Sequence, residues 1–376
     1  MNKSPLALSF GGLLAMAAGI GIGRFVYTPI LPPMVEALHL SKSQAGLIAS
    51  ANFVGYLAGA LIAAVRLPGS RRAWLLGSLL LNAICLVGMG ATTSFALFLL
   101  LRLVAGVVSA FVLIFASALV LDQLASVRRS GLSAVHFAGV GTGIAVSAAL
   151  VACLHDWRAM WEASGALALV AGAAVLVLVP AARAVEGVEA PAKTTFPTGF
   201  TPLAIAYGLF GFGYIITATF IVAMVRGSKE IAHLEPYIWV MFGLSAAPSV
   251  ALWTGFGARW GILRTFAIAA LVEAAGVAAS AVWVTSATVI AASLLVGGTF
   301  MGLTALGLIG ARRGDGDPRG RIALMTAAFS FGQILGPSFA GYLYDLTGSF
   351  SLPSLCAAAA LVVAAGLAAL SSAEQR

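Results

Sequence analysis

The sequence contains few charged residues. Of its 376 residues only 9% are Asp, Glu, Lys or Arg, whereas 61% are hydrophobic. A soluble globular chain carries about 25% charged residues. The shortage excludes an ordinary soluble enzyme, a disordered protein and a nucleic-acid-binding protein, because each needs a more polar surface. The long apolar runs also exclude a membrane β-barrel, whose alternating segments span about 10 residues. A polytopic α-helical membrane protein remains.

Cysteine and histidine are scarce as well. The three cysteines, Cys85, Cys153 and Cys356, are scattered, and so are the four histidines. No spacing suits a disulfide framework or a zinc site. The sequence has no Ser-His-Asp set, and its GVGTG stretch at Gly139 lies inside an apolar run, where no nucleotide loop forms. We therefore expect no catalytic activity, no metal and no cofactor.

Long apolar runs are abundant, and a membrane helix needs about 20 such residues. Six runs precede the polar stretch 181–200 and six follow it. We predict an N-terminal six-helix bundle (1–180), a cytoplasmic linker (181–200) and a C-terminal six-helix bundle (201–376). The predicted runs are 8–34, 44–65, 73–92, 95–121, 131–153, 161–180, 201–225, 236–255, 264–284, 287–311, 322–344 and 350–371.

The net charge of +8 is mostly a topology signal. With the N-terminus in the cytoplasm, fifteen of the 21 Lys and Arg residues lie on the cytoplasmic side and four on the other side. Basic loops stay in the cytoplasm. Both termini are therefore predicted to be cytoplasmic. Two basic residues, Arg24 and Arg102, lie inside runs.

The two halves of the chain resemble each other. The GIGR stretch at Gly21–Arg24 matches GFGY at Gly211–Tyr214. The GVGTG stretch at Gly139 matches GQILG at Gly332, at nearly the same spacing. Two six-helix halves related by a repeat are typical of secondary transporters, whose substrate site lies between the halves near the membrane midplane.

Several motifs resemble those of the major facilitator superfamily. The loops AAVRLPGSRR and GFGARWGILR resemble its Gly-x-x-x-Asp-Arg-x-Gly-Arg-Arg motif, although both lack the acid on which the usual cytoplasmic charge pair depends. Arg102 with Gly106 resembles its Arg-x-x-x-Gly motif, and Asp156-Trp-Arg is another common pattern. The stretches GIGRFVYTPILPPM, ANFVGYLAGAL, HFAGVGTGI and GQILGPSFAGYLYDLTGSF resemble the YbfB/YjiJ-type branch.

This resemblance implies a fold and a setting. It implies an all-α membrane protein of twelve transmembrane helices in two six-helix pseudo-repeat bundles. It further implies a monomer in the bacterial cytoplasmic membrane, with helices 1, 4, 7 and 10 lining a cavity and helices 3, 6, 9 and 12 outside.

Arg24 is the sharpest candidate for a substrate contact. An arginine in the middle of a membrane helix costs roughly 2.5–3.5 kcal/mol and usually faces the bundle interior. Arg102 could be a second substrate clamp or a conformational switch, because the arginine fork binds carboxylate bidentately. For both residues the structural alternative is a bond to backbone carbonyls or an extension of the side chain towards the membrane surface. We expect the prolines at 29, 32 and 33 to break or bend the helix end.

Other polar residues inside the runs complete the predicted substrate site. They are Tyr27, Asn52, Tyr56, His136, Tyr214 and Gln333. His136 could instead shuttle a proton or simply pack in the bundle. Glu273 could carry a proton, make an oligomer contact, or be neutral and hydrogen-bonded. We expect four more residues to act in packing or in conformational change: Gly139, Gly143, Gly336 and Pro337.

The sequence thus predicts a secondary active transporter that moves a small organic anion by alternating access, with a proton or counter-anion as a possible coupling partner. An anion is favoured because the central charges are basic. The alternative within transport is a proton-coupled exporter of hydrophobic, drug-like compounds. An alternative from another class is a non-transporting membrane sensor on the same fold.

Overall fold

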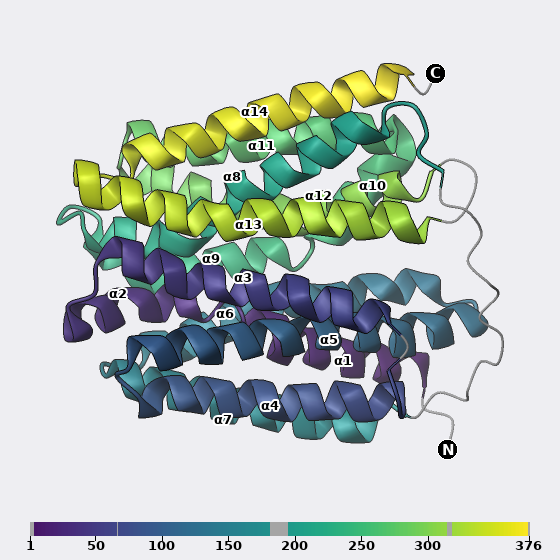
Figure 1. Cartoon of the computed structure of the whole chain (residues 1–376), viewed down its shortest axis with the longest axis horizontal. Helices are drawn as coiled ribbons and strands as arrows, with labels where there is room; N and C mark the ends of the chain where they lie inside the picture. Colours follow the sequence, from purple (N-terminus) through teal and green to yellow (C-terminus); the bar gives the residue numbers. More distant parts are fainter. Residues whose placement is uncertain (1–3, 66, 181–194, 314–317, 375–376) are drawn as a thin grey trace.

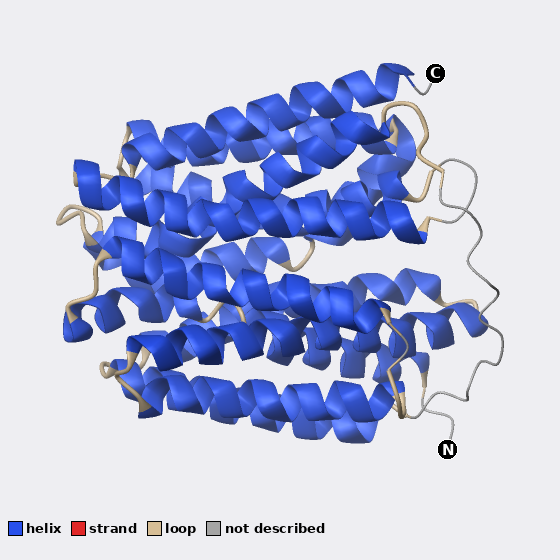
Figure 2. Ribbon diagram, viewed as in Figure 1, coloured by secondary structure: helices blue, strands red, loops and turns tan. Residues whose placement is uncertain are grey.

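Helices make up the computed structural model (Figure 2), which describes residues 4–65, 67–180, 195–313 and 318–374. No strand occurs within these ranges. Most of the predicted linker lies outside them, as do five basic residues that the topology assigns to the cytoplasmic side: Lys3, Arg66, Arg183, Lys193 and Arg376. The bias of charge towards one side therefore rests on the sequence.

The first six spans follow the predicted runs. They are α1 (Pro5–Met16) with η1 (Ala17–Ile22) and α2 (Tyr27–Leu38), then α3 (Lys42–Ala64), α4 (Arg71–Ala91), α5 (Phe95–Ser126), α6 (Ser133–Ala152, after the short 3-10 helix η2, Ser130–Leu132) and α7 (Trp157–Leu178). Side-chain caps fix four of the starts, because Ser4, Ser41, Ser70 and Asp156 each accept a bond from a first-turn backbone N–H. α5 continues past the predicted end at 121, since no helix breaker occurs before Val127.

The last six spans include one that is bent. They are α8 (Phe200–Arg226), α9 (Glu235–Ala246, after the short 3-10 helix η3, Ala232–Leu234) with α10 (Ser249–Trp260), α11 (Ile262–Val282), α12 (Ser286–Ala311), α13 (Arg319–Thr347) and α14 (Ser351–Glu374). The predicted run 236–255 is two helices that meet at 41°. The bend lies at Pro248, which has no N–H to continue the helix. With this pair counted as one, the described chain has twelve spans.

The first span departs from the prediction. We expected its prolines to break or bend the helix end, and α2 runs without a break through Pro32 and Pro33 to Leu38. The irregular part comes earlier, where a π-helix over Ala17–Ile22 is followed by a turn at 23–26. Glycine favours this position, since the stretch GIGIG weakens the α-helix and lets neighbouring helices approach closely. The break in the helix therefore comes before the prolines and not at them, and Arg24 lies inside the irregular segment.

The twelve spans pack as two bundles that meet in the middle of the molecule (Figure 1). α3 and α13 lie side by side across this interface, and α6 packs against α9. Within the bundles, α4 packs on α7 and α11 on α14. α1 begins and α14 ends at the same end of the molecule. The limits of the bundles at residues 180 and 201 stay predictions.

Apolar side chains cover the outer helices. Leu80 on α4, Val170 on α7, Leu271 on α11 and Val363 on α14 are all about half exposed or more, with Val170 at 69%. A soluble protein would place polar groups on such outward helix faces. These helices therefore face lipid, as the resemblance implies for helices 3, 6, 9 and 12.

Candidate functional site

Arg24 lies in the turn between η1 and α2, and it is 6% exposed. Its Cζ atom lies over the rings of Phe53, Tyr56 and Phe25, at 4.4, 4.6 and 5.5 Å from their centroids. Its Nε and Nη2 have no hydrogen-bond partner among the described residues. The side chain is therefore held by aromatic rings and not by an acid, and two buried donors are left for a ligand.

Tyr214 and Gln333 approach Arg24 from the second bundle. The Gln333 amide donates a hydrogen bond to the Tyr214 hydroxyl, which ties α13 to α8. The Tyr214 ring stacks on Phe300 and Phe329 at interplanar angles of 11° and 4°. Tyr214 lies within electrostatic range of the Arg24 guanidinium. The structure thus brings together Arg24 and Tyr56 of the first bundle with this pair of the second.

The neighbours of Arg24 along the chain also reach across the interface. The ring of Phe25 lies 6.4 Å from that of Trp239 and 5.8 Å from that of Phe300. The Thr28 hydroxyl donates to the backbone carbonyl of Ala218 at 2.7 Å. Residues that directly follow Arg24 therefore contact the second bundle, and Arg24 lies where the two bundles meet.

Arg102 supports the irregular segment from α5. Its Nη1 donates to the carbonyl of Gly23 at 3.2 Å, and its Nη2 donates to the carbonyl of Arg24 at 3.1 Å. Its Cζ atom also lies 5.0 Å from the ring centroid of Tyr27. These carbonyls have lost their regular helical partners, and an unsatisfied buried carbonyl is costly in a membrane. The structure therefore directs Arg102 to the backbone that carries Arg24.

Two further side chains hold the same segment, and the sequence analysis missed both. Asn82 on α4 donates to the carbonyl of Ala18 at 3.0 Å. Ser109 on α5 donates to the carbonyl of Gly19 at 2.8 Å. Both residues are fully buried. The available signal was a polar residue inside an apolar run, since such residues bond neighbouring helices.

Tyr27 and Asn52 make backbone contacts inside the first bundle. The Tyr27 hydroxyl donates to the carbonyl of Ala45 at 2.8 Å, which joins α2 to α3. The Asn52 amide donates to the carbonyl of Arg102 at 3.0 Å, which joins α3 to α5. Asn52 keeps an unpartnered Oδ1. Their contact with a substrate stays a prediction.

His136 lies away from Arg24. Its Nε2 is 3.1 Å from the hydroxyl of Ser117 on α5, and its ring packs beside Gly12 of α1. Gly12 lies in α1, and the whole π-helix of Ala17–Ile22 separates α1 from Arg24. The structure therefore does not bring His136 to the site around Arg24.

Glu273 is fully buried on α11. Its Oε2 accepts a hydrogen bond from Thr299 of α12 at 3.0 Å, and its Oε1 has no partner. It lies within electrostatic range of Tyr214. Glu273, the only acid well inside a predicted run, thus faces the interior of the second bundle, close to the Tyr214 side of the site.

Two glycines of α6 allow the first span to pack closely. A side chain at Gly139 would meet the backbone of Leu13, and one at Gly143 would meet the backbone of Ala17. The irregular segment is thereby held against α6 as well as α4 and α5. A packing role fits both residues, and a role in conformational change stays a prediction.

Gly336 and Pro337 lie within α13, which continues through the proline. A side chain at Gly336 would meet Ile215 of α8. The carbonyl of Pro337 lies against Gly46 of α3, in the other bundle. Gly336 therefore packs the second bundle, whereas Pro337 contributes to the contact between bundles.

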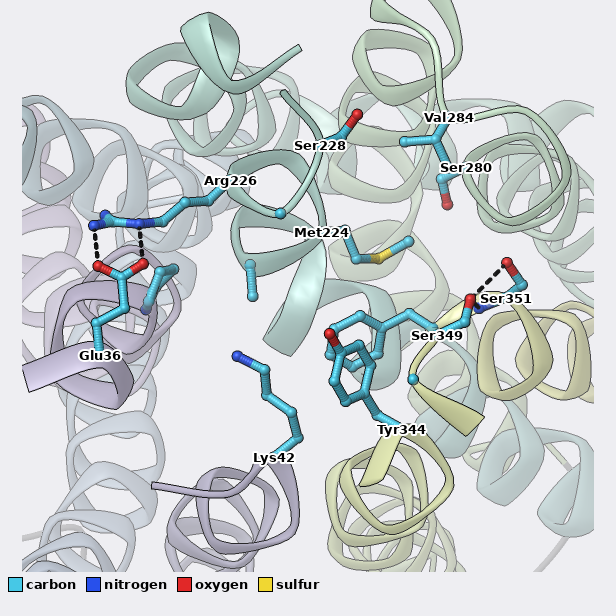
Figure 3. Close-up of a pocket in the computed structure, with 15 residues that line it drawn as sticks. Glu36, Lys42, Met224, Arg226, Ser228, Ser280, Val284, Tyr344, Ser349 and Ser351 are labelled. Carbon is cyan, nitrogen blue, oxygen red and sulfur yellow. Dashed lines mark hydrogen bonds and ion pairs between the residues drawn. The ribbon is translucent and has the colours of Figure 1, made fainter. Parts of the chain in front are cut away.

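A cavity of about 420 Å³ lies at one end of the interface (Figure 3). Arg226 pairs bidentately with Glu36 of the other bundle at 2.8 and 2.5 Å, and it also pairs with Glu235 at 3.0 Å. Lys42 and Tyr344 line the same cavity. None of these residues was a candidate from the sequence, because ion pairs between distant helices leave no local pattern.

Other bonds between the bundles lie towards this end, which we call the closed end. The Asp345 carboxylate of α13 accepts hydrogen bonds from the backbone N–H groups of Lys42 and Ser43 at 3.0 and 2.8 Å. It thereby caps α3 from the other bundle. The Ser50 hydroxyl donates to the carbonyl of Ile334 at 2.7 Å. Ion pairs, a helix cap and serine contacts thus join the bundles on this side.

Solved structures of transporters share this fold. A crystal structure of the nucleoside transporter NupG superimposes with a TM-score of 0.72 at 15% identity, covering 99% of this chain and 100% of that one. A bacterial homologue of the human lysosomal transporter Spinster, inward-facing and unoccupied, superimposes with a TM-score of 0.68 at 15% identity, covering 100% and 97%. At this identity the likeness establishes the fold alone, which is that of the major facilitator superfamily.

Sequence comparison gives the family. The chloramphenicol resistance protein of Streptomyces lividans is 29% identical over 244 residues, 62% of this chain. The match spans 59% of that protein, less than two thirds of its length. Residues 16–369 match the family described as the uncharacterised MFS-type transporter YbfB, which confirms the resemblance seen in the sequence motifs. The chain therefore belongs to this family of membrane transporters in the major facilitator superfamily.

Proposed function

We propose that this protein is a secondary transporter that moves a small organic anion across the bacterial cytoplasmic membrane. The observation that carries the proposal is Arg24, a buried arginine between the bundles whose Nε and Nη2 have no partner. Leaving a buried donor unpaired costs about 1–3 kcal/mol, and more for a charged group. An anion that binds there supplies the missing partner.

Alternating access is the second part of the proposal. The hydrogen bonds and ion pairs between the bundles gather towards the closed end, which carries Glu36, Lys42, Arg226 and Asp345. In the predicted topology this end is non-cytoplasmic, and we propose that the structure is an inward-facing state. The likeness to an inward-facing Spinster homologue supports this assignment. Transport then requires these contacts to break while contacts form at the opposite end.

The test is transport by purified protein in proteoliposomes, with a panel of radiolabelled organic anions. We expect Arg24→Gln to reduce uptake of the transported anion about tenfold or more, because the substrate's charge loses its buried partner. Arg264→Gln is the matched control, since Arg264 is exposed at the start of α11. Unchanged uptake by Arg24→Gln would remove Arg24 from the site, and no uptake of any anion would refute the function.

A second candidate is proton-coupled export of hydrophobic compounds. It is favoured by the fully buried Glu273, whose Oε1 has no partner, and by the sequence relative named as a chloramphenicol resistance protein. This function predicts efflux of an uncharged aromatic compound driven by a pH gradient. Glu273→Gln would abolish that coupling, whereas Arg24→Gln would leave it intact. The reverse pattern supports the anion transporter.

A further inference from the structure

The unpartnered atoms of Arg24 define a particular edge of its guanidinium. Nε and Nη2 point their N–H groups to the same side, which forms a planar fork with two parallel donors. The rings of Phe53 and Tyr56 lie against the guanidinium, so a ligand approaches along this edge. Two parallel donors match the two oxygens of one carboxylate. Building on the proposed function, we infer that the transported anion is a monocarboxylate held side-on by Arg24.

The number of free guanidinium forks sets how many anionic groups of the substrate the site binds. Arg102, the other arginine near the site, donates to the carbonyls of Gly23 and Arg24. At the closed end, Arg226 is paired with Glu36 and Glu235. Arg102 thus has only its Nε left unpartnered, and Arg24 presents the free fork of two parallel donors near the site. A dicarboxylate or a phosphate carries about −1.5 to −2 at neutral pH and would bury a second anionic charge that no free fork accepts.

Tyr214 supplies a third donor. Its hydroxyl oxygen accepts the hydrogen bond from Gln333, so its own O–H proton is free to point elsewhere. The Tyr214 ring stacks on Phe300, and Phe300 contacts Phe25, the residue that follows Arg24. The Tyr214 O–H therefore donates to the carboxylate across the interface between bundles, and Gln333 is a positioning residue that fixes this orientation. A substrate held in this way contacts both bundles.

Aromatic rings form the remaining surroundings. Phe25 contacts Phe300 of the second bundle at 5.8 Å between ring centroids, and Phe300 in turn stacks on Tyr214. Flat apolar surfaces favour an apolar organic group attached to the carboxylate. Benzoate is accordingly a suitable probe, with acetate and propionate as smaller members of the series.

The experiment measures binding to purified full-length protein by calorimetry and thermal shift. The probes are acetate, propionate and benzoate, with benzamide as the uncharged analogue and phthalate and phenylphosphonate as dianions. We expect saturable binding of at least one monocarboxylate and affinities at least about tenfold lower for the neutral and dianionic analogues.

Two substitutions test the geometry. Arg24→Lys keeps the charge but removes the fork, and we expect it to weaken monocarboxylate binding about tenfold or more. Tyr214→Phe should weaken monocarboxylate binding about fivefold to tenfold. Adding Gln333→Leu to Tyr214→Phe should weaken binding no further, because Gln333 acts through Tyr214. Arg264→Lys should leave binding unchanged. The benzoate-to-benzamide preference reports the contact with the carboxylate separately from any change in folding.

The outcomes separate this inference from the proposed function. Tighter, Arg24-dependent binding of phthalate or phenylphosphonate would overturn the monocarboxylate and leave anion transport standing. Full monocarboxylate affinity in Arg24→Lys would overturn the side-on fork. If no monocarboxylate binds, the inference is wrong. If only benzamide binds, and its binding does not depend on Arg24, both the inference and the proposed function are wrong.

Discussion

The two buried arginines Arg24 and Arg102 lie close together and have different roles. Arg102 donates from Nη1 and Nη2 to backbone carbonyls and leaves only Nε unpartnered, whereas Arg24 leaves both Nε and Nη2 unpartnered. The same side chain can therefore act as a structural bond or as a ligand site, depending on which acceptors surround it. At the residue scale, function is indicated by what a charged group lacks and not by its presence in the membrane.

Arg102→Met tests the structural task. It leaves the carbonyls of Gly23 and Arg24 unpaired, and a hydrogen bond to a charged group contributes about 1.5–3 kcal/mol. We expect a clear fall in the thermal midpoint of the purified protein, and Arg102→Lys should recover part of it by bonding one carbonyl. Circular dichroism and fluorescence melts measure the change. A variant with a normal midpoint that has lost anion binding would instead place Arg102 in the substrate site.

At the scale of the element, the first span shows what sequence patterns can and cannot give. The number and approximate limits of the spans followed from the apolar runs, because about 20 residues cross a membrane. The π-helix at Ala17–Ile22 did not follow, and the prolines suggested a break in the wrong place. Arg24 stood out as a charge in an apolar run. The structural role of Arg102 could not be predicted from the sequence, because its hydrogen-bond acceptors are backbone carbonyls that only the irregular segment leaves without helical partners.

The structure also explains the Arg-x-x-x-Gly motif of α5 by the contacts of its two residues. Arg102 bonds to the first span, and one turn later Gly106 lets α3 approach, since a side chain there would meet the backbone of Asn52 and Tyr56. Gly106→Ala should therefore separate α3 from α5 and destabilise the protein by about 2 kcal/mol or more.

Gly77→Ala on α4 is the matched control for that change. Nothing lies within 4 Å of the side chain it would add. Alanine favours a helix over glycine by about 0.5–1 kcal/mol, so this variant should be neutral or slightly stabilised. Thermal melts of both variants measure the difference. Equal midpoints would mean that α3 can move away from α5 without loss.

At the scale of the whole molecule, the two bundles are joined towards one end, and the contacts there differ in strength. The Arg226–Glu36 pair is partly exposed, with side-chain exposures of 33% and 60%, and such pairs contribute about 0–1 kcal/mol. Asp345 caps two backbone N–H groups of α3, and loss of a helix cap costs about 0.5–2 kcal/mol. The Asp345 cap should therefore stabilise the closed end more than the Arg226–Glu36 ion pair does.

Labelling of a cysteine placed at Ser50 measures this balance, because Ser50 is 5% exposed between the bundles and should react only when the closed end opens. In a background without Cys153 and Cys356, Asp345→Ala should raise the maleimide labelling rate about threefold to tenfold, since 1.4 kcal/mol is a factor of ten in an equilibrium. Arg226→Ala should raise it less, and Asp122→Ala, which alters an exposed pair between α4 and α5, should not change it. A larger effect of Arg226→Ala would show that the ion pair, and not the cap, holds the closed end. An unchanged rate in both variants would mean that apolar packing of α3 on α13 alone keeps the bundles together.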